Sequence, residues 1–177
     1  MKISALFHIA ALSLAAALIT LPAFAADADA PAAIIDHGDT VTIENGLIAL
    51  TVNKADANMV SFIYKGADII NGRNSLNAGR GYWNVYGQIP GGEKTQAKGT
   101  PSQLTITQDP AKNKGAAAEI QLFFPYTPGN GSEPVDIAIR YTLKRGDSGV
   151  YGWTSVSHKP GYPPFDIEAS TVAMKLN

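Results

Sequence analysis

The stretch GRGYWNVYGQ, residues 79–88, brings together the side chains best suited to holding a ligand. Arg80 stands between two glycines, which lets a ligand approach the backbone closely. A guanidinium group can hold a uronate carboxylate with two hydrogen bonds, and the rings of Tyr82 and Trp83 offer apolar faces to the C–H groups of a sugar. The combination favours an acidic saccharide as ligand.

Core packing is the competing interpretation of the same aromatic residues, because aromatic side chains on strands commonly lie in the core. Successive residues of a strand face opposite sides of a sheet. If Tyr82 and Asn84 face one way, Trp83 and Val85 face the other. At most half of this set can therefore reach one ligand.

Residues for acid–base chemistry are few beyond the N-terminal segment. His37 falls in a leader and is expected to be solvated. His158 closes an expected strand beside Lys159, and a base and a cation at a strand end could line a cleft. A surface histidine before the turn KPGYPP is the more common role for such a residue, and both interpretations stay open.

The sequence contains none of the familiar catalytic motifs: no Ser-His-Asp pattern, phosphate-binding loop, zinc-protease helix or calcium loop. The stretch GDSG, residues 146–149, is interpreted as a hairpin turn. A carboxylate pair for glycoside hydrolysis depends on spatial pairing, which the sequence does not reveal. We predict no catalytic residue, no metal site and no cofactor.

The chain opens with the features of a secretory signal peptide: a positive start, an apolar run, and an Ala-x-Ala pattern at residues 23–25. We expect residues 1–25 to be cleaved, residues 26–39 to form a leader and residues 40–177 to form one β-sandwich domain. The polar stretch after Ala25 argues against an uncleaved anchor, and no later stretch is apolar enough to cross a bilayer. The mature protein is expected to be secreted or periplasmic, with no contact to a membrane.

Composition narrows the function further. The 177 residues carry a formal net charge of −1, which argues against a polybasic partner of nucleic acid. Cysteine is absent, so that neither a disulfide nor a thiolate metal site is possible. With 17 glycines and 11 prolines, the chain is expected to form many turns and few helices.

Period-two alternation predicts strands along most of the chain. The clearest strand is VDIAIRYTLKR, residues 135–145, and the predicted core residues are Val135, Ile137, Ile139, Tyr141, Ile120 and Leu122. Turns are expected at Asn45-Gly46 and Lys65-Gly66. About nine or ten short strands separated by glycine-rich turns predict an all-β protein, an antiparallel β-sandwich. The last strand ends with the chain, and we expect self-association through an uncovered edge.

Four segments in order resemble the N-terminal domain of the rhamnogalacturonan lyases of polysaccharide lyase family 4. They read TVTIENGLIALTVNK, MVSFIYKGADIIN, RGYWNVYG and SGVYGWTSVSHKPGYPPFDIEASTVAMKLN. The family shows an NGL hairpin, a strand ending in Y-x-G, an RGYWD segment, and a strand reading GVYGYAIYEH with FDI downstream. The match in order and approximate spacing runs from about Thr40 to the end of the chain.

The resemblance implies a galactose-mutarotase-like supersandwich and β-elimination on rhamnogalacturonan I, a pectic polysaccharide. In that reaction a base removes the proton alpha to the uronate carboxylate, and the 4-linked rhamnose leaves. Cationic side chains are expected to neutralise the carboxylate. A pectic polysaccharide or oligosaccharide is therefore the expected partner, with Arg80, Tyr82, Trp83 and His158 as the expected substrate-binding residues.

The chain also departs from the family. Asn84 stands where the family often has aspartate, and Thr171 stands near the position of a substrate-binding arginine. The catalytic lysine and histidine of the family are expected beyond the strand at which this chain ends, which predicts a truncated lyase portion without turnover. The alternatives are a non-catalytic carbohydrate-binding sandwich for acidic oligosaccharides and a non-functional remnant that folds poorly.

Overall fold

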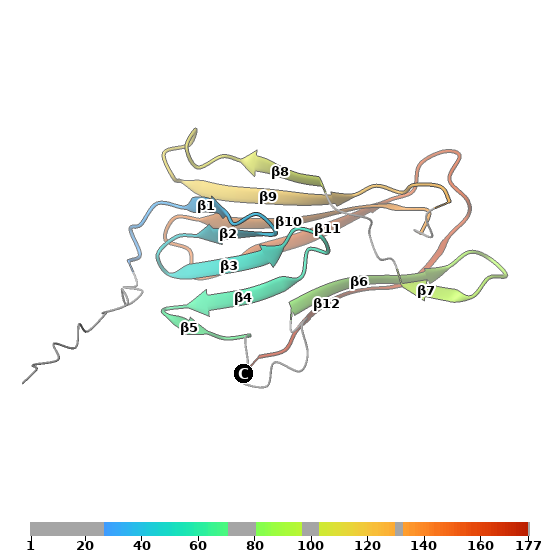
Figure 1. The fold of residues 1–177 in the computed structure, drawn as a ribbon, viewed down its shortest axis with the longest axis horizontal. Helices are drawn as coiled ribbons and strands as arrows, with labels where there is room; N and C mark the ends of the chain where they lie inside the picture. The colour runs from blue at the N-terminus through green and yellow to red at the C-terminus, as the bar shows by residue number, and fades with distance from the viewer. Residues whose placement is uncertain (1–26, 71–80, 97–102, 130–132, 177) are drawn as a thin grey trace, which may run out of the picture.

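Two antiparallel sheets face each other in the computed structural model, which describes residues 27–70, 81–96, 103–129 and 133–176 (Figure 1). Within these ranges the chain forms strands and turns and no helix, and accordingly no helix that could span a membrane. The all-β prediction is confirmed, and the two sheets agree with a β-sandwich.

The larger sheet has eight strands. Six of them follow one another in the order β1-β2-β3-β4-β6-β12, while β5 pairs with β4 and β7 pairs with β6. Their bounds are β1 Ala33–Asp36, β2 Thr40–Glu44, β3 Ile48–Asn53, β4 Met59–Tyr64, β5 Ala67–Asp68, β6 Gly81–Gln88, β7 Lys94–Gln96 and β12 Asp166–Met174. Strand β1 lies within residues 26–39 and places Ile34 opposite Ile43, so the sheet begins before Thr40.

The smaller sheet has four strands in the order β11-β10-β9-β8. Their bounds are β8 Gln103–Gln108, β9 Ala117–Phe124, β10 Asp136–Lys144 and β11 Tyr151–Ser157. The segment before β9, which contains Pro110 and Gly115, forms turns. The chain returns from β11 to the larger sheet through residues 158–165, which connect to β12.

The two predicted hairpin turns are present. Gly46 joins β2 to β3 with a φ of 79°, and Lys65 and Gly66 join β4 to β5 with φ values of 48° and 84°. Gly46 also lies against the N-terminal segment, since a Cβ atom there would come within 2.4 Å of the carbonyl oxygen of Asp27. Any other residue at Gly46 would have to displace that segment.

The core lies between the sheets and contains all six residues predicted for it. On β10 the buried side chains alternate from Ile137 to Leu143, and Val135, Ile120 and Leu122 are also buried. They meet the inward side chains of β2 and β3, such as Ile43 and Leu50, in one cluster. The strand phase read from the sequence is therefore correct.

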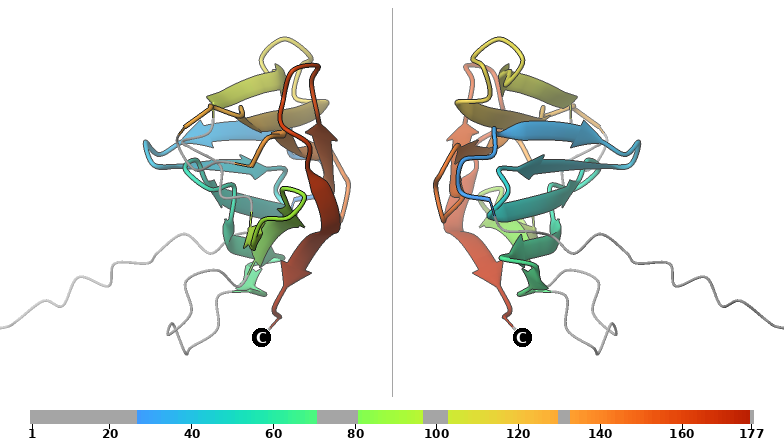
Figure 2. Two further views of the ribbon diagram at one scale, coloured as in Figure 1. Left: turned by 90° about the vertical axis from the view of Figure 1, so that its right-hand side faces the viewer. Right: turned by 90° about the vertical axis from the view of Figure 1, so that its left-hand side faces the viewer.

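Strands β11 and β12 run along one side of the molecule, each in a different sheet (Figure 2). An apolar cleft of about 270 Å³ opens between them. Its walls include Trp83 and Tyr141 from the interior, and Val150 and Val172 from the two flanking segments. Strand β12 comes last in the order of the larger sheet, and nearly all its residues are exposed.

Candidate functional site

The residues expected to bind substrate are separated by the fold. Arg80 lies outside the described residues. Trp83 is buried in the core and lines the apolar cleft, whereas Tyr82 is half-buried on the opposite face of β6. The expected alternation along residues 79–88 is therefore present from Gly81 onward.

The glycine that follows Arg80 is used for packing. A Cβ atom on Gly81 would lie 2.6 Å from the Cβ of Met59, the residue opposite it on β4. The close approach of β4 to β6 therefore explains why a glycine stands at position 81. The sequence alone had suggested that this glycine gives a ligand access to the backbone.

The side chains of β6 and β12 that point away from the core, together with Lys175 just after β12, form a surface that we call the β6–β12 face. It is made of Tyr82, Asn84, Tyr86, Thr171 and Lys175, of which Asn84 is buried at 8% exposure. Antiparallel pairing places Asn84 opposite Thr171 and Tyr82 opposite Ala173. The Asn84 amide donates to the hydroxyl of Tyr86 at 3.3 Å. The residues of β12 opposite Tyr86, Asn84 and Tyr82 are the small residues Ala169, Thr171 and Ala173. The two tyrosine rings therefore have only short side chains beside them on β12.

Lys175 supplies a cation to this face. Its Nζ lies 5.4 Å from the centroid of the Tyr82 ring, within the range of a cation–π interaction. Sequence reasoning did not select Lys175, because only the pairing of β6 with β12 brings it to Tyr82. A flat ring beside an ammonium group suits the apolar side of a pyranose that carries a carboxylate.

An ion pair lies at the other end of these strands. Lys94 of β7 contacts the carboxylate of Glu168 on β12 at 2.8 Å. Both side chains are substantially exposed, so the pair contributes little to stability. The pair reaches across β6, which lies between β7 and β12.

His158 lies in the connection between β11 and β12, far from Tyr82. That connection reaches β12 at Asp166, whereas Tyr82 pairs with Ala173; seven residues of strand span roughly 23 Å. His158 is exposed, its Nε2 lies 2.8 Å from the carbonyl oxygen of Pro163, and its ring meets the ring of Tyr162 edge-on at 5.8 Å.

Asp136 anchors this connection. Alternation along β10 directs its side chain away from the core, yet it is only 3% exposed, because residues 158–165 and Tyr126 cover it. Its carboxylate accepts hydrogen bonds from the Tyr126 amide at 2.8 Å and the Tyr162 hydroxyl at 3.0 Å, and it pairs with Lys159.

These contacts set the charges at the anchor. Burial raises the pKa of Asp136, but the hydrogen bonds from Lys159, Tyr126 and Tyr162 outweigh it and hold the pKa below the usual value. The hydrogen bond to Asp136 in turn raises the pKa of Lys159. Lys159 therefore stays protonated at neutral pH and acts as a cation rather than as a base.

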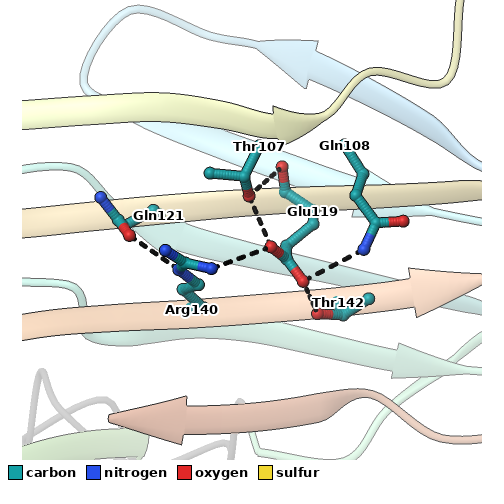
Figure 3. A network of polar contacts seen from close by, with 6 residues as sticks. All are labelled: Thr107, Gln108, Glu119, Gln121, Arg140 and Thr142. Carbon is teal, nitrogen blue, oxygen red and sulfur yellow. Dashed lines mark hydrogen bonds and ion pairs between the residues drawn. The ribbon is translucent and has the colours of Figure 1, made fainter. Parts of the chain in front are cut away.

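Glu119 is the centre of a polar network on the outer face of the smaller sheet (Figure 3). Its carboxylate accepts hydrogen bonds from Thr107 and Thr142, each at 2.6 Å, and from Gln108 at 3.3 Å. Arg140 lies 3.6 Å away. Burial raises the pKa of Glu119, but these partners outweigh it and lower the pKa.

A carboxylate held in this way is ill suited to proton transfer. With its pKa lowered, Glu119 is ionised at neutral pH and cannot serve as a general acid. Its oxygens are occupied by hydroxyl and amide donors, so a nucleophilic role also requires breaking the network. Among the described residues, no group of three or more His, Asp or Glu side chains is arranged to hold a metal ion.

Comparison with known proteins adds one finding. A model of the Rhamnogalacturonate lyase family matches residues 18–177, nearly the whole chain. No curated protein matches it. The resemblance identified from the four sequence segments is confirmed by the family model.

Proposed function

Because the chain belongs to the Rhamnogalacturonate lyase family, we propose that it binds the acidic pectic polysaccharide rhamnogalacturonan through the β6–β12 face. The observation that carries this proposal is the placement of the Lys175 ammonium group over the Tyr82 ring. Stacking on the ring holds the sugar, and the ammonium group neutralises the uronate carboxylate. Arg80, which directly precedes β6 in the sequence, stays a proposed substrate-binding residue.

Family membership also supports a specific reaction, β-elimination on the galacturonate–rhamnose backbone. That reaction needs a neutral base near the proton alpha to the carboxylate, and a cation that stabilises the enolate-like intermediate. We assign the cationic role to Lys175. His158 and Lys159 are adjacent, but the pairing of Lys159 with Asp136 keeps that lysine protonated.

The chain is accordingly a saccharide-binding sandwich that does not turn over its substrate by itself. A general base and a general acid each contribute typically about 10²–10⁴-fold to rate, and the β6–β12 face as described supplies a cation and a ring. The resemblance to the family supports the proposal that this sandwich is the N-terminal portion of a galactose-mutarotase-like supersandwich. The protein is exported to the periplasm or the medium after cleavage near Ala25.

Two measurements on the full chain test this proposal. Titration with rhamnogalacturonan oligosaccharides in a calorimeter is expected to give saturable heat. Incubation with the polymer is expected to give no ultraviolet absorbance from an unsaturated product. Absence of heat at millimolar ligand would reject the binding function, and growth of the absorbance would show that the chain is an active lyase.

A further inference from the structure

The outer face of the smaller sheet carries two exposed aromatic rings that the proposed function does not use. Tyr151 is 56% exposed and Trp153 is 44% exposed. Because they are two residues apart on β11, both side chains project from the same face. They lie opposite Thr142 and Arg140 of β10, respectively, next to the network around Glu119.

Arg140 is held in a fixed position between the network and the Trp153 ring. Its Nε donates to Gln121 at 2.7 Å and its Nη1 lies 3.6 Å from Glu119. Its guanidinium carbon lies 4.4 Å from the centroid of the Trp153 ring. The stacked guanidinium group orients the Trp153 ring. The Arg140 side chain is still about one-third exposed.

The more exposed charged side chains beside the rings are the cations Arg140, which also pairs with Glu119, and Lys144. The carboxylates of Glu119 and Asp136 are only 8% and 3% exposed and accept hydrogen bonds from neighbouring donors. Lys144 is exposed at the end of β10, with its Nζ 5.6 Å from the Tyr151 ring. Both aromatic rings therefore have a cation beside them.

We propose that Tyr151, Trp153 and Arg140 form a second binding surface for acidic saccharide, on the smaller sheet and separate from the β6–β12 face. The ligand class rests on the proposed function. Two rings along one strand provide successive stacking positions for neighbouring pyranose units, and Arg140 and Lys144 attract the uronate carboxylates. Gln121 lies opposite Arg140 on β9, and Ser155 follows Trp153 by two residues on β11, so both project from this face and can hydrogen-bond sugar hydroxyls.

This surface also has a competing explanation. Strand β11 lies at the edge of the smaller sheet, and exposed aromatic residues at an edge can mediate association with another copy of the chain. The positive charge beside each ring favours an anionic ligand over a second identical positive face, since like charges would meet in a symmetric contact.

The test compares variants of the full chain in titrations with galacturonate oligosaccharides. Trp153→Ala is expected to weaken binding by about three- to tenfold, the range for loss of one aromatic contact, and Trp153→Phe to retain most of the affinity. Val60→Ala, which removes exposed apolar surface from β4, is the matched control and is expected to leave affinity unchanged. Circular dichroism and melting verify that each variant is folded.

Tyr82→Ala separates this inference from the proposed function. Loss of affinity with Tyr82→Ala but not with Trp153→Ala would overturn the second surface and leave the proposed function intact. No binding by the unmodified chain would reject both. A monomer fraction that rises with Trp153→Ala, at unchanged saccharide affinity, would identify the face as a contact between copies and overturn the inference.

A second measurement needs no variant. The chain has two tryptophans, of which Trp83 is 8% exposed and Trp153 is 44% exposed. Collisional quenching by acrylamide therefore reports mainly on Trp153. Saturating galacturonate oligosaccharide is expected to reduce this quenching, whereas quenching that stays unchanged while calorimetry detects binding would overturn the second surface.

Discussion

The ammonium nitrogen of Lys175 lies 5.4 Å from the centroid of the Tyr82 ring, so the residue that follows β12 meets the strand singled out in the sequence. The contact depends on the pairing of β6 with β12, in which Tyr82 lies opposite Ala173. Two segments about ninety residues apart in the chain thereby form one surface. This face places a flat ring and a positive charge where an acidic sugar can use both.

The ring itself is expected to supply the stacking contact. Tyr82→Phe keeps the ring and should bind rhamnogalacturonan oligosaccharide with nearly unchanged affinity. Tyr82→Ala removes the ring and should weaken binding by about 0.5–1.5 kcal/mol, the range for an aromatic contact. Titration calorimetry on the three proteins decides, and equal losses for both variants would show that the hydroxyl, rather than the ring, carries the interaction.

Asn45 is expected to be a main structural link between the sheets. It is fully buried, and its amide donates to the carbonyl oxygens of Lys144 and Asp147, each at 2.8 Å. Asn45→Ala leaves both carbonyls unsatisfied and should lower the free energy of unfolding by about 2–4 kcal/mol. At roughly 3 °C per kcal/mol for a domain of this size, the melting temperature should fall by about 6–12 °C.

Asn58 offers the matched control for that experiment. Its side-chain amide donates to Asp56 in the same exposed turn, so Asn58→Ala should change the melting temperature little. Equal losses for the two asparagine variants would contradict a structural link through Asn45.

Acid sensitivity is expected to depend on Asp136. Its pKa is lowered in the folded protein, where Lys159, Tyr126 and Tyr162 stabilise the carboxylate against the opposing effect of burial. Below the pKa of about 3.9 in an unfolded chain, the unfolded state binds the proton first, so stability falls as pH decreases. Above that value the contribution is fully present.

Denaturant unfolding between pH 6 and pH 3, roughly spanning that transition, tests the assignment. Asp136→Asn should be less stable than the unmodified chain at pH 6 and should show a shallower loss of stability at the acid end. Asp36→Asn is the control, because Asp36 also has a lowered pKa from its bond to Lys54 but is exposed, where such a pair contributes little. Identical pH profiles for Asp136→Asn and the unmodified chain would exclude Asp136 as the acid-sensitive group.

The core assignment of β10 predicts a large cost for a charge at Ile137. This side chain is 3% exposed between the two sheets, and Ile137→Asp would leave a buried carboxylate without a partner. The expected destabilisation is about 3–5 kcal/mol, measured by urea unfolding. Lys144→Asp, at the exposed end of the same strand, should lower the free energy of unfolding far less. Similar losses for the two variants would mean that burial of the charge does not determine the destabilisation.

Self-association is expected through β12. Val172 is 64% exposed and Ile167 is 50% exposed on a strand at the end of the larger sheet, and such edges favour pairing with another chain. Val172→Lys should shift the protein toward monomer in light scattering, because two lysines would then meet across the edge. Val60→Lys on β4 is the control. An equal shift toward monomer with this variant would mean that the added net charge, rather than the edge of β12, controls self-association.

Much of the fold could be predicted from the sequence, because strand alternation and tight turns are set by residues that are close together in the chain. Alternation along β10 identifies Ile137 and Ile139 as core residues, and the Asn45-Gly46 pair identifies the first hairpin. Strand β1 was missed, because its four residues AIID are short and follow an alanine-rich stretch. It becomes a strand only by pairing with β2.

The site was less predictable, since contacts between distant strands create it. The sequence selected Tyr82 but not Lys175, whose position depends on the pairing of β6 with β12. Alternation along β10 alone would leave Asp136 on the face away from the core, whereas the connection carrying Lys159 and Tyr162 covers it. Spacing along the chain carries no signal for either contact.

Saccharide binding by the β6–β12 face is tested most directly by a calorimetric titration of the full chain with rhamnogalacturonan oligosaccharide, repeated on two lysine variants. Lys175→Gln removes the cation over Tyr82, whereas Lys65→Gln removes a similar cation, 5.3 Å from the Tyr64 ring at the β4–β5 turn. We expect saturable binding that Lys175→Gln weakens about tenfold and Lys65→Gln leaves unchanged. Equal affinity for all three proteins, or no heat from any of them, would contradict it.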